Sequence, residues 1–125
     1  MARILVIEDD GMLRSMLKQM LEHEGHDVLV ASDGLEASRL YQKNPLDLII
    51  TDVLMPEKDG LEVIMEIRAK MPQVKIIAIS GGGRISHTDY LVAARRLGAQ
   101  KTLSKPFVRR DLLDALKELL VVEEE

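Results

Sequence analysis

Five short apolar runs alternate with segments of helical periodicity along the chain, and this alternation restricts the fold more than any other feature. The apolar runs cover residues 3–7, 27–30, 46–51, 74–79 and 100–103. Most of them are rich in Ile, Leu and Val and are too short for typical helices, as buried parallel strands are. Because right-handed crossovers place helices on both faces of a parallel sheet, we expect an α/β fold with a five-stranded, doubly wound sheet.

Five helices are expected to follow these strands in turn. Their apolar periodicity covers residues 13–21, 34–44, 61–71, 89–97 and 111–122. Glu36 follows Asp33 by three residues, which is close to a capping-box arrangement at the start of the second helix. Gly25 and Gly98 follow the first and fourth helical segments, and glycine is typical of the position that ends a helix.

The composition indicates a globular chain and excludes several functions. Of the 125 residues, 17 are Lys or Arg and 21 are Asp or Glu, so the net charge is −4. The basic residues occur as scattered pairs, so we expect no direct nucleic-acid partner. The absence of Cys excludes disulfides and Cys-type zinc sites, and no apolar run approaches the length of a membrane span. We therefore expect a cytoplasmic protein without a membrane partner, with one domain over residues 1–122 and an acidic tail over 123–125.

Polar side chains stand at the carboxyl ends of four expected strands. They are Glu8, Asp9 and Asp10 after the first strand, Asp52 after the third, Ser80 after the fourth and Lys105 after the fifth. In parallel α/β sheets these strand ends face one crevice, so the side chains are expected to converge. Crowded carboxylates repel one another, and Mg²⁺ is a hard cation that relieves such repulsion with few protein ligands. Together with a hydroxyl and an ammonium group, this site could hold a phosphoryl group, with Asp52 as the nucleophile.

Each of these residues also has an ordinary structural explanation. Asp52 could cap a turn or the next helix, and the acidic triplet at residues 8–10 could form the first turn of a helix. Ser80 could belong to an ordinary loop, and Lys105 could be a surface lysine. Their shared position at strand ends, in the same register, favours a common site over four separate explanations.

Seven short motifs carry a resemblance to a known family. They are Ile4-Leu-Val-Ile-Glu8-Asp9, Asp47-Leu-Ile-Ile-Thr-Asp52, Met55-Pro56, Asp59-Gly60, Ser80-Gly81, Gly98-Ala99 and Lys105-Pro106-Phe107. With these motifs in the family's order and spacing over almost the whole chain, the sequence resembles the response-regulator receiver domains of two-component signalling, in particular the single-domain chemotaxis type. The resemblance implies a flavodoxin-like fold with strand order 2-1-3-4-5.

The resemblance also implies a phosphoacceptor and a metal site. Asp52 would accept a phosphoryl group from the phosphohistidine of a sensor histidine kinase or a phosphotransfer protein, in a reaction that needs Mg²⁺. The metal ligands would be Glu8, Asp9, Asp52 and the backbone carbonyl of Leu54. Within the acidic pair, Asp9 would bind the metal directly and Glu8 would act through water. Asp10, one residue further along, would not be a ligand.

Three more residues would contact the phosphoryl group or its donor by the same resemblance. Ser80 would supply the switch hydroxyl, and Gly81 would leave room for the donor. Lys105 would bind the phosphoryl oxygens, and the Lys105–Pro106 bond is often cis in this family.

The region expected to carry the output departs from the family pattern at Thr102 and in the glycine-rich run of residues 81–84. The face formed by the fourth helix, the last strand and the final helix would bind a downstream effector. Family members often carry an aromatic residue on the last strand where this chain has Thr102, so no aromatic ring can change rotamer there to report phosphorylation. We therefore expect the signal to pass through ordering of residues 81–97, because the glycines at 81–83 raise the entropic cost of ordering this loop.

Two other functions compete with the phosphoacceptor interpretation. A phosphatase of the haloacid dehalogenase type also uses a strand-end Asp, but it usually needs a second Asp two residues later, where this chain has Leu54. A scaffold that binds partners without phosphorylation would not need the acidic pair, Asp52, Ser80 and Lys105 all in place. We therefore expect a module that catalyses only its own phosphorylation and slow dephosphorylation, and not a turnover enzyme.

Overall fold

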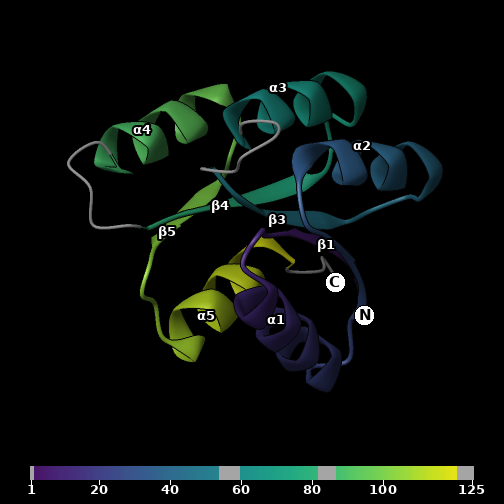
Figure 1. Ribbon diagram of the computed structural model, residues 1–125, viewed down its shortest axis with the longest axis vertical. Coiled ribbons are helices and arrows are strands. Elements are labelled where there is room, and N and C mark those ends of the chain that lie inside the picture. Colours follow the sequence, from purple (N-terminus) through teal and green to yellow (C-terminus); the bar gives the residue numbers. More distant parts are fainter. Residues whose placement is uncertain (1, 54–59, 82–86, 121–125) are drawn as a thin grey trace, which may run out of the picture.

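The computed structural model describes residues 2–53, 60–81 and 87–120, and strands and helices alternate through them (Figure 1). The strands are β1 (Arg3–Ile7), β2 (Asp27–Ala31), β3 (Leu48–Asp52), β4 (Lys75–Ser80) and β5 (Lys101–Ser104). The helices are α1 (Gly11–His23), α2 (Gly34–Lys43), α3 (Gly60–Lys70), α4 (His87–Leu97) and α5 (Arg109–Leu119). This order confirms the α/β fold expected from the apolar periodicity.

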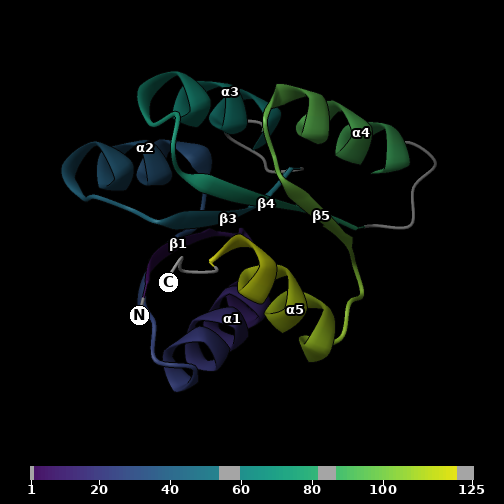
Figure 2. The same cartoon turned by 180° about the vertical axis from the view of Figure 1, so that it is seen from behind.

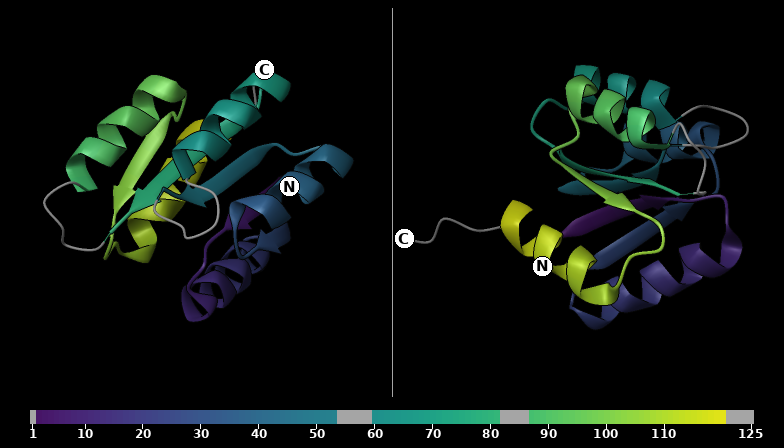
Figure 3. Two further views of the ribbon diagram at one scale, coloured as in Figure 1. Left: turned by 45° about the horizontal axis from the view of Figure 1, so that its top comes forward. Right: turned by 90° about the vertical axis from the view of Figure 1, so that its left-hand side faces the viewer.

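All five strands are parallel and form one sheet in the order β2-β1-β3-β4-β5, which is the order that the resemblance implied. Helices α1 and α5 cover one face of the sheet, and α2, α3 and α4 cover the other (Figures 1 and 2). The right-hand view in Figure 3 shows the same three layers. Because the chain moves outward from β1 to β2 and then crosses back to β3, the strand order reverses between β1 and β3. A crevice for ligands is expected at the carboxyl ends of these two strands.

Alternate side chains of the strands enter two separate cores. Ile4 of β1 and Ile50 of β3 pack on the side of α1 and α5, whereas Leu5 of β1 and Ile49 of β3 pack on the side of α2, α3 and α4. Every residue of β3 is buried, including its last residue, Asp52. The carboxylate of Asp52 is therefore held at the end of a strand that both cores immobilise.

Several element boundaries differ from the expected ones for local reasons. Helix α1 begins at Gly11, two residues early, because Asp10 caps it by accepting hydrogen bonds from the backbone N–H groups of Met12 and Leu13. The central strand begins at Leu48, because Leu46 is a half-buried loop residue that packs against the core. Strand β5 ends one residue later than expected, and α4 and α5 each begin two residues earlier. The last two residues of the expected final helix, 121 and 122, lie outside the described residues.

The predicted helix signals at Asp33, Gly25 and Gly98 are confirmed. The Asp33 carboxylate accepts a hydrogen bond from the Glu36 backbone N–H at 2.8 Å, and the Glu36 carboxylate accepts one from the Ser32 backbone N–H at 2.7 Å. Gly25 (φ 95°) and Gly98 (φ 129°) adopt the left-handed backbone that ends α1 and α4. Among the helices described, none has both the length and the apolar character needed to cross a membrane.

Candidate functional site

Glu8 lies directly after β1 and is almost fully buried, with 1% of its surface exposed. Its backbone N–H donates to the Ala31 carbonyl at 3.0 Å, and its Oε2 accepts a hydrogen bond from the Asp10 backbone N–H at 3.1 Å. Its Oε1 accepts no hydrogen bond among the described residues. Burial, reinforced by the negative charge of Asp52, raises the pKa of Glu8 to about 7. A buried carboxylate oxygen that accepts no hydrogen bond is suited to a cation.

Asp52 stands at the end of β3, beside β1 in the sheet. Glu8, Asp9 and Asp52 can each offer one carboxylate oxygen such that all three oxygens lie within 4.8 Å of one another. Asp9 is exposed, so the group is open to solvent on one side. The structure thus brings together the three carboxylates that the sequence predicted as metal ligands.

Lys105 follows β5 and reaches into this acidic group. Its Nζ lies 3.1 Å from Asp52 Oδ2 and 3.2 Å from Glu8 Oε1. Burial alone would lower the pKa of Lys105, but the carboxylates of Asp52 and Glu8 raise it overall. Lys105 is therefore a firmly protonated counter-ion of the carboxylates, and its peptide bond to Pro106 is cis.

Ser80 ends β4 on the other side of Asp52. The residue is fully buried, and its Oγ has no hydrogen-bond partner among the described residues. Its backbone carbonyl accepts a hydrogen bond from the Lys105 backbone N–H at 2.8 Å, which ties the end of β4 to the segment after β5. A buried hydroxyl without a partner is free to donate to a group that enters the site.

Gly81 has a structural role that sequence reasoning did not identify. A Cβ built on Gly81 would lie 2.3 Å from Lys105 Cβ and 2.6 Å from Lys105 Cδ. Gly81 therefore leaves room for the aliphatic part of Lys105. The predicted role in making room for the donor stays a prediction.

Gly60, the first residue of α3, packs against the backbone at the end of β3. Its N–H donates to the Val53 carbonyl at 3.1 Å, and a Cβ on Gly60 would lie 2.2 Å from the Asp52 carbonyl oxygen. In the sequence, Gly60 belongs to the Asp59-Gly60 motif of the resemblance. No pattern in the local sequence indicates that Gly60 contacts the backbone of Asp52 and Val53.

The donor set fits a hard divalent cation. It consists of carboxylate oxygens, one of which lacks a hydrogen bond, and it is partly open to water, as magnesium sites are. The predicted fourth ligand, the Leu54 carbonyl, lies outside the described residues. The Oδ1 atom of Asp10, which the resemblance did not assign as a ligand, accepts two hydrogen bonds from the start of α1.

Arg14 is a further residue at this site that sequence reasoning missed. Its Nη1 donates a hydrogen bond to the Glu8 backbone carbonyl at 2.8 Å. The available signal was an arginine in the first turns of the helix that follows the acidic pair, but that position alone does not indicate where the side chain points.

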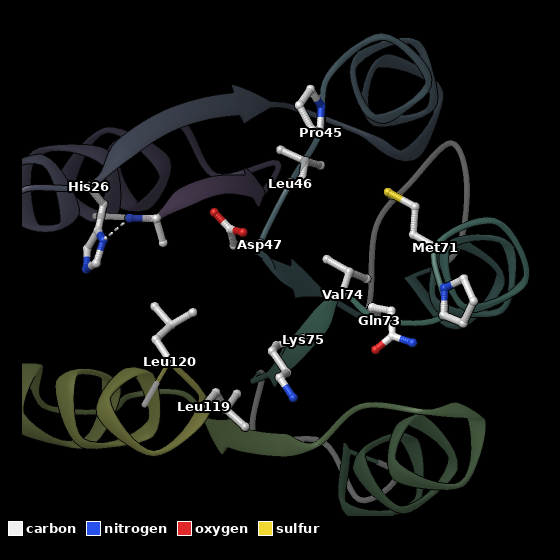
Figure 4. A pocket seen from close by; sticks show the side chains of 12 residues that line it. His26, Pro45, Leu46, Asp47, Met71, Gln73, Val74, Lys75, Leu119 and Leu120 are labelled. Carbon is white, nitrogen blue, oxygen red and sulfur yellow. Dashed lines mark hydrogen bonds between the residues drawn. The ribbon is translucent and has the colours of Figure 1, made fainter. Parts of the chain in front are cut away.

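A cavity of about 590 Å³ opens at the opposite, amino-terminal edge of the sheet (Figure 4). Its lining is mainly apolar, with Leu46, Val74 and Leu120 around the side chains of Asp47 and Lys75. None of the residues predicted for the phosphoryl site lines this cavity. The two edges of the sheet are therefore chemically distinct.

Comparisons with a family model, with known sequences and with solved structures all match response regulators. Residues 4–117 match the family model of the response regulator receiver domain. The chain is 36% identical to the response regulator receiver protein CpdR of Brucella abortus, over 97% of this chain and 98% of that protein. The solved structure of response regulator protein TrrA from Thermotoga maritima, in complex with Mg²⁺-BeF, is 34% identical, has a TM-score of 0.84 and is covered over 100% of its chain.

Other relatives are longer than this chain. The response regulator MprA of Mycobacterium sp. (strain KMS) is 36% identical over 118 residues, which are 94% of this chain but 50% of that protein. The chain thus spans about half the length of these curated relatives.

Proposed function

The chain belongs to the response regulator receiver domain family of two-component systems, and we propose that it is a phosphoacceptor module in which Asp52 receives the phosphoryl group. The observation that carries this proposal is the position of the Asp52 carboxylate. It lies at the end of a buried strand, 3.1 Å from Lys105 Nζ and within the group formed with Glu8 and Asp9. The phosphoryl group would come from a phosphohistidine of a sensor histidine kinase or a phosphotransfer protein.

The proposed step is an in-line transfer between two side chains. An Asp52 carboxylate oxygen attacks phosphorus, the P–N bond to the donor histidine breaks, and the imidazole nitrogen keeps the electron pair. Mg²⁺, held by Glu8, Asp9 and Asp52, would neutralise charge on the phosphoryl oxygens. Lys105 would exchange its contact with Asp52 for a phosphoryl oxygen, and the unpaired Ser80 hydroxyl would donate to another.

An apolar surface beside the site supports docking of a protein donor. Met12 and Met16 on α1 are exposed, Met12 by 85%, and together with Phe107 and Lys105 they line a cavity of about 640 Å³. A protein that brings a phosphohistidine to Asp52 would contact this surface. Exposed methionines adapt to different partner surfaces, which suits a transient complex.

Three expectations remain part of this proposal. The module would act in the cytoplasm, it would not be a turnover enzyme, and it would bind an effector through α4, β5 and α5.

Intact mass spectrometry tests the proposed function directly. Incubation with Mg²⁺ and a small phosphodonor should add one phosphoryl group, and removal of Mg²⁺ with EDTA should reduce the yield at least about tenfold, because three neighbouring carboxylates repel an incoming phosphoryl group without the cation. Proteolysis should map the phosphate to the peptide that contains Asp52. No phosphate, even with a competent histidine kinase, would favour the scaffold alternative.

Amide hydrogen exchange tests how the signal leaves the site. Thr102 is half-buried and pairs with Ala78 of β4, so no aromatic ring is available on β5 at this position. We expect Mg²⁺ with beryllium fluoride to slow exchange in residues 81–97, because the Ser80 hydroxyl and the adjacent backbone would bind the phosphoryl analogue. The same addition to Asp52→Asn should leave amide exchange in residues 81–97 unchanged. Unchanged protection of 81–97 in the unsubstituted protein would contradict this route of signalling.

A further inference from the structure

Within the part of the chain that the structure describes, two basic side chains contact the acidic group, and they bind different kinds of atoms. Lys105 Nζ contacts carboxylate oxygens of Asp52 and Glu8. Arg14 Nη1 instead donates to the backbone carbonyl of Glu8, at 2.8 Å. Lys105 therefore occupies oxygens that a metal ion would use, whereas this hydrogen bond of Arg14 leaves the carboxylates available.

The carbonyl that Arg14 binds lies beyond the end of the β1 ladder. The last paired residue of β1 is Ile7, which faces Ala31 of β2 and Thr51 of β3. The Glu8 N–H still reaches the Ala31 carbonyl at 3.0 Å, but the Glu8 carbonyl is bound by Arg14. The peptide unit between Glu8 and Asp9 is thus held next to the sheet by a charged donor. This peptide joins the two acidic residues of the predicted pair.

Arg14 is itself well anchored. Its backbone N–H donates to the Asp10 carbonyl at 2.9 Å, and Asp10 in turn caps α1. Arg14 is half-buried, and its Nη1 reaches the Glu8 carbonyl just after β1. Hydrogen bonds from Ser32 are the main cause of the lowered pKa of Glu36 in α2, and the positive charge of Arg14 also lowers it.

We infer that Arg14 is a positioning residue for the cation site: it holds the Glu8–Asp9 peptide so that both carboxylates stay beside Asp52 when no cation is present. Three carboxylates within 4.8 Å repel one another, and an unrestrained Glu8–Asp9 segment would move away from Asp52. A charge-assisted hydrogen bond to the intervening peptide opposes this movement without using a ligand oxygen. The inference rests on the proposed function only in taking this group as the site of Mg²⁺.

Isothermal titration calorimetry with MgCl₂ tests the inference, because two explanations predict opposite changes in the Mg²⁺ affinity of Arg14→Met. If Arg14 acted only through its charge, Arg14→Met would remove a repulsive cation and bind Mg²⁺ more tightly. If Arg14 positions the ligands, Arg14→Met should raise the dissociation constant about tenfold, as loss of a residue that orients metal ligands usually does. Tighter or unchanged binding would overturn the inference.

Arg109→Met is the matched control, since it removes the same charge from an exposed residue that pairs with Glu24. It should change the Mg²⁺ dissociation constant by less than about twofold, in keeping with a screened surface charge. Arg14→Lys keeps the charge but loses the planar guanidinium. Its Mg²⁺ dissociation constant should lie between those of Arg14→Met and the unsubstituted protein. If Arg14→Met does not fold, Arg14→Lys decides, and unchanged binding in that variant overturns the inference.

Phosphorylation by a small phosphodonor separates this inference from the proposed function. At saturating Mg²⁺, Arg14→Met should be phosphorylated within about threefold of the unsubstituted rate, because the hydrogen bond of Arg14 is to backbone and not to the reacting carboxylate. A loss that saturating Mg²⁺ does not restore would contradict a role through the metal. If neither the unsubstituted protein nor any variant is phosphorylated, the proposed function fails. The calorimetric result would still test the role of Arg14 in binding Mg²⁺.

Discussion

Asp52→Asn should gain no phosphate from Mg²⁺ and a small phosphodonor under conditions that phosphorylate the unsubstituted protein. The amide lacks the anionic oxygen that attacks phosphorus. The substitution also removes one of three neighbouring carboxylates, so Mg²⁺ affinity should fall as well. Intact mass measures the first effect, and calorimetry with MgCl₂ measures the second.

Asp47→Asn is the matched control, because it makes the same chemical change just before the other end of β3. The Asp47 carboxylate lies at the amino-terminal edge, where its Oδ2 accepts a hydrogen bond from the Arg3 backbone N–H at 2.8 Å. This variant should be phosphorylated like the unsubstituted protein. Phosphate on Asp52→Asn would mean that another carboxylate is the acceptor, and Asp9, the exposed member of the group, would be tested next.

Gly60→Ala should lower the free energy of unfolding by about 3 kcal/mol, at the upper end of what overpacking usually costs. Its Cβ would lie 2.2 Å from the Asp52 carbonyl oxygen and 2.4 Å from Val53 Cα. Both are backbone atoms, so no side-chain rotation relieves the clash, and α3 or the end of β3 must move. Urea unfolding followed by circular dichroism measures the loss, and slower phosphorylation should accompany it.

Gly11→Ala separates the clash from a general effect of replacing a glycine at a helix start. Gly11 is the first residue of α1, as Gly60 is of α3, but its Cβ would meet only Arg14 Nη2, at an ordinary 3.6 Å. We expect this variant to be neutral or slightly more stable, since Ala favours helix over Gly. Equal losses in the two variants would contradict the explanation by the backbone clash at Gly60.

The composition of the site could be predicted from the sequence because the residue at each strand end is local information. A short apolar run that ends in an acid indicates both a strand and the side chain at its end, and parallel topology then places such ends at one edge. Glu8, Asp52 and Lys105 were selected in this way, and the structure places them in mutual contact around the Lys105 ammonium group.

The residues that support the site could not be predicted from local sequence. Gly81 is needed because the aliphatic part of Lys105, 24 residues later, passes over it, and Gly60 is needed because α3 begins against β3. Arg14 matters through the backbone carbonyl of Glu8, which no side-chain pattern reveals. In each case the requirement arises from contact between two segments and not from either segment alone.

The sequence by itself determined the alternation of strands and helices and the residue type at each strand end. These are local properties, since the period of apolar residues follows from which side chains each element buries. Only the tertiary structure decided which oxygens meet, which carbonyl Arg14 binds, and where a Cβ cannot fit. These depend on strand register and on the packing of helices against the sheet, because side chains and backbone from distant segments must fill the same space at close-packed density.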